Sequence, residues 1–100
     1  ILFELFDGEI LGVENENFEI NIYPNPANDL IKVKSSYNPQ NPLKFMLIDK
    51  LGRPLLIRES FDQNKIDEVI ELNHINSGLF ILLVYDGNHL LSTKKVIINR

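Results

Sequence analysis

The stretch Leu79-Phe80-Ile81-Leu82-Leu83-Val84-Tyr85-Asp86-Gly87-Asn88 decides the fold class. Its first seven residues are continuously apolar, which is typical of a central strand buried on both faces. Asp86-Gly87-Asn88 predicts a tight hairpin turn, because Gly and Asn adopt the positive φ angles that such turns need. The apolar stretch 90–98 then returns beside the first strand, so the sequence predicts a β-hairpin here.

Short stretches with strand periodicity precede this hairpin, separated by turn residues. Ile66, Val69 and Ile70 also fit helical spacing, but their β-branched content favours a strand. With the hairpin, about seven strands fall at spacings near ten residues, which predicts an all-β antiparallel sandwich. The predicted earlier strands cover residues 18–22, 31–33, 43–48, 55–58 and 66–72.

Length and composition indicate one globular domain. The 100 residues are 44% apolar and 24% charged, which is ordinary for a folded soluble domain and argues against disorder. No apolar stretch approaches the roughly 18–20 residues of a membrane-spanning helix. The absence of cysteine excludes thiol nucleophiles and thiolate metal sites.

The charge distribution divides the chain at about residue 17. Residues 1–20 carry six carboxylates and no Lys or Arg, while the remainder has only a small positive excess, so nucleic-acid binding has no electrostatic basis. Because the chain starts at Ile1 without Met, we expect it to be a fragment of a longer protein, in which the acidic front end is a solvated linker. Residues 1–13 could form a hairpin around Asp7-Gly8. We predict that their apolar side chains pack against something: Leu2, Phe3, Leu5 and Phe6.

The polar residues predict no enzyme, metal site or cofactor. His74 and His89 lie in consecutive turns, which fall at opposite ends of a sandwich. No nucleophile elbow, zinc-binding motif or phosphate-binding loop is present. Asp62, Asn64 and Asp67 loosely resemble a calcium loop but lack its central Gly and closing Glu.

Four stretches stand out from this generic pattern. They are Ile22-Tyr23-Pro24-Asn25-Pro26-Ala27-Asn28-Asp29, Leu47-Ile48-Asp49-Lys50-Leu51-Gly52-Arg53, Ile70-Glu71-Leu72-Asn73-His74-Ile75-Asn76-Ser77-Gly78-Leu79-Phe80 and Thr93-Lys94-Lys95-Val96-Ile97. In this order they resemble the motifs of the type A C-terminal sorting domains of the type IX (Por) secretion system. Ile48 replaces the usual aromatic residue, Leu79-Phe80 stands for Ile-Tyr, and Pro54 after Arg53 suggests a strand that starts late or lies at an edge.

The resemblance implies an immunoglobulin-like β-sandwich over residues 18–100 that acts as a secretion signal and is not itself an enzyme. In that family the domain ends a larger cargo protein, and an outer-membrane translocon recognises it in the periplasm. A sortase-like signal peptidase usually removes it, and the cargo becomes extracellular or attached to the cell surface. Cleavage would then fall within residues 8–16, and residues 1–17 would hold the end of the cargo.

The same resemblance supplies candidate recognition residues, each of which also has a purely structural interpretation. The prolines and Asn25 could simply build a corner, and the glycines could serve turns that need positive φ. The lysines could protect an edge strand, and residues 96–98 could pair within the sheet or offer an edge to a partner strand. The candidates are Tyr23, Pro24, Asn25, Pro26, Gly52, Arg53, Gly78, Lys94, Lys95, Val96 and Ile97.

The alternative function is an accessory adhesion or carbohydrate-binding sandwich retained on the mature protein; a fibronectin-type spacer is a third possibility. A sugar-binding module needs exposed aromatic side chains as a stacking platform. The chain has no Trp, and Tyr85, at the end of the central strand, is expected to be half-buried. Tyr37, in the proline-rich loop 35–42, keeps this alternative open.

Overall fold

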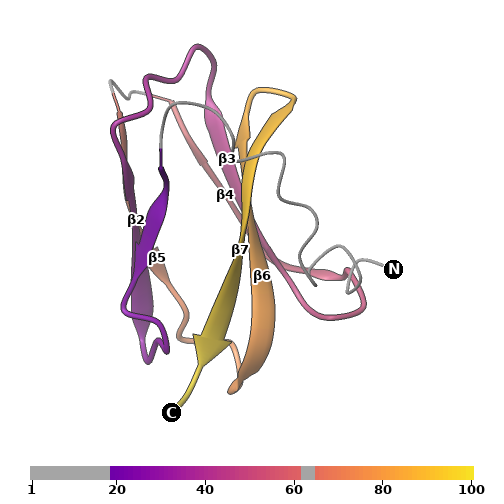
Figure 1. The fold of residues 1–100 in the computed structure, drawn as a ribbon. Coiled ribbons are helices and arrows are strands. Elements are labelled where there is room, and N and C mark those ends of the chain that lie inside the picture. Colours follow the sequence, from indigo (N-terminus) through magenta and orange to yellow (C-terminus); the bar gives the residue numbers. More distant parts are fainter. Residues whose placement is uncertain (1–18, 62–64) are drawn as a thin grey trace.

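The computed structural model describes residues 19–61 and 65–100, which form seven β-strands (Figure 1). This confirms the predicted all-β class, including the strand over residues 66–71 that also fitted helical spacing. The described residues include no helix long enough to cross a membrane. The strands are β1 Asn21–Tyr23, β2 Leu30–Ser35, β3 Leu43–Ile48, β4 Pro54–Ser60, β5 Ile66–Glu71, β6 Gly78–Asp86 and β7 His89–Ile98.

The strands form two antiparallel sheets that pack face to face. One sheet has the order β1-β2-β5, and the other has the order β4-β3-β6-β7. The chain crosses between the sheets after β2, β4 and β5, which is the connectivity of a β-sandwich rather than of a simple meander. Figure 1 shows the two layers, with β2 and β5 on one side and β3, β4, β6 and β7 on the other. The predicted seven-stranded β-sandwich is therefore confirmed.

The core lies between the two sheets and is almost entirely aliphatic. Alternate residues of each strand point inward because successive side chains of a strand project to opposite faces. Each fully buried aliphatic or aromatic side chain contributes about 1.5–3 kcal/mol relative to an exposed one. The innermost residues include Ile31, Val33, Leu43, Phe45, Leu47, Ile66, Ile70, Leu72, Leu82, Val84, Leu91, Val96 and Ile98.

The hairpin that decided the fold class forms between β6 and β7. Asp86 pairs with His89 across the turn, and Gly87 has a φ of 62°. The two-sided burial predicted for residues 79–85 is only partly correct. Phe80, Leu82 and Val84 face the core, whereas on the other face Ile81 is buried and Leu79, Leu83 and Tyr85 are half-buried. A two-layer sandwich covers only one face of each strand.

The two open sides of the sandwich are closed differently. Main-chain hydrogen bonds join the segment after β1 to β7, which is the edge strand on that side. On the other side β4 and β5 are the edge strands, and an ion pair links Arg58 Nε to Glu68 Oε2 at 2.7 Å. β4 begins at Pro54 and is the first strand in the order of its sheet. The edge position that this proline suggested is therefore confirmed.

Several predictions lie outside the described residues. These are the hairpin over residues 1–13, the acidic linker, the boundary between residues 17 and 18, the cleavage segment 8–16, and the positions of Asp62 and Asn64.

Candidate functional site

All four quoted motifs contribute to one end of the sandwich, which we call the motif end. It contains the segment 24–29 after β1, the β3–β4 turn, the β5–β6 loop and the last residues of β7. Figure 1 shows the turn after β1, the β5–β6 loop and the C-terminus together at the lower end of the molecule. The motifs are far apart in the sequence, so only the fold brings them together.

The Pro-Asn-Pro-Ala segment lies along the edge of β7. Ala27 N–H donates to Ile97 O at 2.6 Å, and Asn99 N–H donates to Ala27 O at 2.8 Å. The side chain of Asn25 adds two bonds, one from its Nδ2 to Lys95 O at 2.8 Å and one from Ile97 N–H to its Oδ1 at 3.0 Å. The first motif therefore occupies the outward edge of the last motif, 72 residues away in the case of Asn25 and Ile97.

The prolines explain why this segment leaves its own sheet. Neither Pro24 nor Pro26 has an N–H to donate to a ladder, and β1 ends at Tyr23. Both prolines follow cis peptide bonds, at Tyr23–Pro24 and Asn25–Pro26. Tyr23 pairs with Lys32 on β2 and is 41% exposed, and both prolines and Asn25 are exposed as well.

The last motif is divided between the interior and the surface. Val96 is fully buried and pairs with Phe80, whereas Ile97 is 39% exposed and pairs with Leu79. Lys94 pairs with Leu82 and is half-buried, and Lys95 pairs with Ile81 and is exposed. Residues 96–98 therefore pair with β6, and the backbone of Ile97 on the other side is occupied by Asn25 and Ala27.

The third motif holds the end of the chain. Arg100 N–H donates to Ser77 Oγ at 3.1 Å, and the Arg100 guanidinium donates to Leu72 O and Asn73 O. Leu72 N–H in turn donates to Asp29 O at 2.8 Å, which links the β5–β6 loop to the first motif. Gly78 starts β6 opposite Ile98 with a φ of 157°. The C-terminal residues are therefore part of the folded surface.

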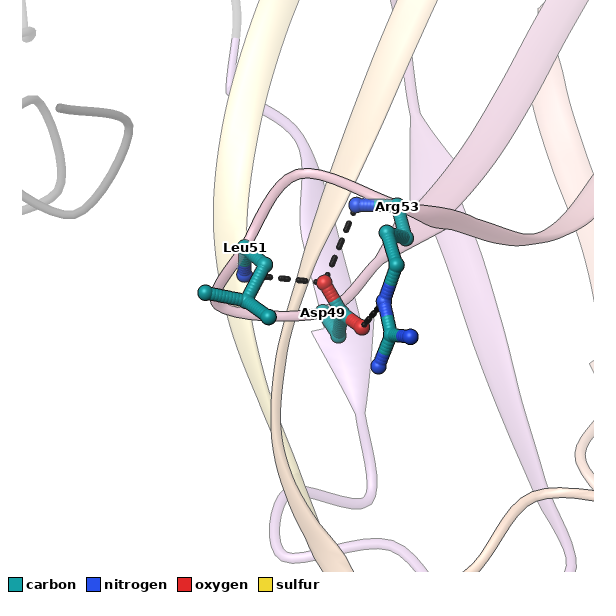
Figure 2. Close-up of polar contacts among 3 residues, drawn as sticks. All are labelled: Asp49, Leu51 and Arg53. Carbon is teal, nitrogen blue, oxygen red and sulfur yellow. Dashed lines mark hydrogen bonds and ion pairs between the residues drawn. The ribbon is translucent and has the colours of Figure 1, made fainter.

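The second motif builds the β3–β4 turn around one carboxylate, as Figure 2 shows. Asp49 Oδ1 accepts the N–H groups of Leu51 at 2.8 Å and Arg53 at 3.0 Å, and Asp49 Oδ2 accepts Arg53 Nε at 2.7 Å. The Arg53 N–H, helped by the Arg53 guanidinium and the Leu51 N–H, holds the pKa of Asp49 below its ordinary value despite some desolvation. Gly52 has a φ of 87°, the left-handed region in which a Cβ is strained, so its predicted positive φ is confirmed.

An open cavity of about 450 Å³ connects this turn to the third motif. Leu56, Ile75 and Phe80 supply apolar lining, while charged groups from both motifs lie around it. Since Arg53 is bound to Asp49 through Nε, its turn presents an oriented guanidinium beside the cavity. The lining residues are Asp49, Arg53, Leu55, Leu56, Glu71, His74, Ile75, Asn76 and Phe80.

The opposite end of the sandwich holds a polar cluster that the sequence reasoning missed. Asp86 is 3% exposed; its Oδ2 accepts Tyr37 Oη at 2.6 Å and Gln40 N–H at 3.0 Å, and its Oδ1 accepts Asn41 N–H at 2.8 Å. Burial opposes ionisation of Asp86, but these donors outweigh it and lower its pKa. The sequence could have indicated that Asp86 is buried, because Asp86 continues the alternation by which Leu82 and Val84 point into the core.

The described residues give little support for catalysis or metal binding. His74 lies in the β5–β6 loop and His89 is the first residue of β7, so they lie near opposite ends of β6 and do not converge. Residues 19–61 and 65–100 contain no group of three or more His, Cys, Asp or Glu side chains that could hold a metal ion. Asp67 of the weak calcium motif lies 3.9 Å from Lys34 Nζ instead.

Within residues 19–61 and 65–100 the aromatic side chains do not form a stacking platform for a sugar. Tyr37, whose place in the proline-rich loop kept the carbohydrate-binding alternative open, is half-buried, packs against the core and donates its hydroxyl to Asp86. Tyr85 is half-buried, as predicted, with Lys44 Nζ 5.4 Å from its ring centroid. Tyr23 and Phe61 are exposed but lie on different parts of the sandwich.

Comparison with known proteins agrees with the motif assignment. No match was found among curated proteins. Residues 21–99, most of the chain and all four motifs, match the family described as the secretion system C-terminal sorting domain. Because this match covers well over half of the chain, the protein belongs to that family, whose domains are C-terminal sorting signals that direct secreted or cell-surface cargo proteins through the type IX secretion system.

Proposed function

We propose that the secretion machinery recognises the folded motif end rather than a linear C-terminal peptide. The observation that carries this proposal is the set of hydrogen bonds from Asn25 and Ala27 to β7. These bonds, with those of Arg100 to the β5–β6 loop, make the last residues inseparable from the first and third motifs. A partner that binds here contacts residues contributed by several motifs at once.

The proposed recognition residues are the exposed members of the motif end. Lys95 and Ile97 present a positive charge and an aliphatic side chain beside the exposed corner formed by Pro24 and Pro26. Arg53 adds a second, oriented positive group at the β3–β4 turn. Gly52, Gly78 and Val96 support this surface through the backbone or the core, and Tyr23 and Lys94 lie at its borders.

The proposed partners are the outer-membrane translocon, which would bind the domain in the periplasm, and a sortase-like signal peptidase, which would cleave within residues 8–16. The domain itself acts as a substrate and has no catalytic role. Cleavage there would leave the sandwich whole, because β1 begins only at Asn21. The cargo would then be released or attached at the cell surface.

A secretion assay tests this proposal. A fluorescent cargo with a signal peptide is fused to residues 1–100 and expressed in a host with a working type IX system. Deleting residues 94–100 is a poor test, because it removes buried Val96 and Ile98 and half of the β6–β7 pairing. Point variants Lys95→Glu and Ile97→Ser change exposed side chains and leave the core intact.

Matched controls are available on the other sheet. Lys32→Glu alters an exposed lysine on β2, and Val69→Ser alters a side chain 42% exposed, close to the 39% of Ile97. We expect the Lys95 and Ile97 variants to be retained in the periplasm while both controls are secreted, with equal thermal stability of the purified domains. Equal secretion of all four variants would refute the recognition surface. Retention of the unmodified fusion would contradict the sorting function in this chain.

A further inference from the structure

The four edge strands of the described sheets differ in how well they are protected against pairing with another strand. β1 has only three residues, and the segment after it covers the outward side of β7. β5 carries carboxylates at three of its six positions, Asp67, Glu68 and Glu71. β4 has seven residues, and no strand within residues 19–61 and 65–100 pairs with its outward side. A long edge strand without a cover is a template for a further strand.

Exposed apolar side chains gather along β4. Within the strand, Leu55 is 43% exposed and Ile57 is 55% exposed. Leu51, in the turn before the strand, is 79% exposed, and Phe61, directly after it, is 72% exposed. The other exposed large apolar side chains of the described region lie one each on β1, β5 and β7. β4 therefore combines an open main chain with an apolar surface, which marks an interaction site.

The features of β4 that discourage strand pairing are either confined to one end or neutralised. Pro54 is its first residue, and the register shift against β3 falls opposite the same end. The charge of Arg58, which a second strand would approach, is already paired with Glu68 at 2.7 Å. A second strand can therefore pair along the remainder of β4.

We propose that two copies of this domain associate through antiparallel pairing of their β4 strands. The two four-stranded sheets then form one continuous sheet, and a two-fold axis relates the two copies. In an antiparallel pair the start of one strand lies beside the end of the other, so every contact at one end of the pair is repeated at the other end. This inference does not depend on the sorting function.

A second copy is favoured as the partner because the two ends of β4 are chemically complementary. Leu51 comes near Phe61 of the other copy, so the two most exposed large apolar side chains of the described region cover each other. Arg53 comes near Glu59 of the other copy, and both are exposed. The Arg53 side chain is 72% exposed although its Nε is bound to Asp49, so its guanidinium can also donate to a second carboxylate. Apolar surfaces and opposite charges thus meet at both ends of the strand pair.

The middle of the strand pair is apolar, because Leu55 and Ile57 of each copy meet the same two residues of the other. β5, the other uncovered edge strand, offers no such match, since its three carboxylates would meet those of a second copy. β4 and β7 are opposite edges of one sheet, so pairing through β4 leaves Lys95 and Ile97 accessible. The β4 contact is therefore separate from the surface around β7 that we propose for sorting.

Disulfide trapping tests the proposal, because the chain has no cysteine of its own. Leu51→Cys and Phe61→Cys variants of the full chain are prepared separately, mixed in equal amounts and oxidised mildly, and the disulfide products are separated by mass. Antiparallel pairing brings residue 51 of one copy near residue 61 of the other, whereas the two residues 51 lie ten strand positions apart, up to about 33 Å. We expect the mixed disulfide to exceed either homodisulfide several-fold beyond the about twofold excess that random collision produces.

A mixture of Val69→Cys and Phe61→Cys provides the collision baseline, since Val69 lies on the other sheet and is 42% exposed. A product ratio for the mixture of residues 51 and 61 that equals this baseline would overturn the proposal. A dominant homodisulfide of Leu51→Cys would overturn it as well, because it would place the same ends of two β4 strands together.

Sedimentation velocity provides an independent measurement on the unmodified chain. We expect its weight-average sedimentation coefficient to rise with protein concentration. Ile57→Lys places a charge in the middle of the strand pair and should abolish this rise, whereas Val69→Lys, the matched change on β5, should preserve it. Equal thermal unfolding of the two variants verifies that both are folded. No rise in the unmodified chain, or an equal rise in the Ile57→Lys variant, would contradict the proposal.

Discussion

Replacing Asp86 with Asn is expected to destabilise the domain strongly, although Asp86 lies far from the motif end. The carboxylate is 3% exposed and accepts three hydrogen bonds, from Tyr37, Gln40 and Asn41. These bonds tie the loop between β2 and β3 to the β6–β7 hairpin. Asn keeps the shape but loses the charge and replaces one acceptor oxygen with a donor group.

The magnitude follows from the number of donors left without an acceptor. The amide of Asn keeps one acceptor oxygen. With that oxygen in the place of Oδ2 it still accepts the Tyr37 hydroxyl and the Gln40 N–H, while the amide nitrogen in the place of Oδ1 leaves the Asn41 N–H without an acceptor. A buried donor without a partner costs about 1–3 kcal/mol, and hydrogen bonds to charged groups contribute about 1.5–3 kcal/mol each. We therefore expect Asp86→Asn to lower the free energy of unfolding by about 2–4 kcal/mol, a large part of the roughly 5–15 kcal/mol typical of a domain.

Urea denaturation at several pH values measures this effect. The hydrogen bonds lower the pKa of Asp86 in the folded state, so its stabilisation is present above the ordinary carboxyl pKa of about 3.9 and is lost as the pH falls through the lowered value. The stability difference between the unmodified chain and Asp86→Asn should be full at pH 7 and shrink in strong acid.

Two further variants serve as comparisons for the stability loss of Asp86→Asn. Tyr37→Phe removes one of the three donors and is expected to cost about 1–2 kcal/mol. Asp67→Asn breaks only a half-exposed ion pair with Lys34 and should cost at most about 1 kcal/mol. A cost for Asp86→Asn no larger than that of Asp67→Asn, or one that does not diminish in acid, would refute the reasoning.

Three further changes probe the motif end. Asn25→Ala removes both side-chain bonds to β7; it should cost about 1–2 kcal/mol and speed hydrogen exchange at the Ile97 amide, and unchanged exchange would contradict this. Gly52→Ala places a Cβ at a φ of 87° and should cost about 1–2 kcal/mol in thermal unfolding, unless the turn adopts another conformation visible in amide shifts. Arg100→Ala removes the guanidinium bonds to the β5–β6 loop, so it should lower the unfolding midpoint modestly and speed hydrogen exchange at the Ile75 amide. No change in either measurement would show that these bonds do not hold the C-terminal residue against the loop.

The sequence by itself determined the strands and the family. Apolar patterns, β-branched content and turn residues are local properties, and together they located six of the seven strands closely; among these, the continuous apolar stretch 79–85 identified a strand inside its sheet. The ordered motifs identified the family because they depend on residue identity and spacing alone. The first strand was predicted over residues 18–22, while the structure has β1 at Asn21–Tyr23, which the prolines end.

Only the tertiary structure decided which motifs contact one another and which side chains they bury. Alternation indicates which residues share a face, but it does not state which edge a distant segment will cover. Asn25 meets Ile97 because the proline-containing segment leaves one sheet and reaches the edge of the other, a contact 72 residues apart in sequence. The sequence predicted Asp86 to be a turn residue. In the structure its carboxylate is a buried acceptor, because the side chain points inward and the β2–β3 loop supplies the donors. Long-range contacts of this kind depend on how two sheets pack, which local patterns do not encode.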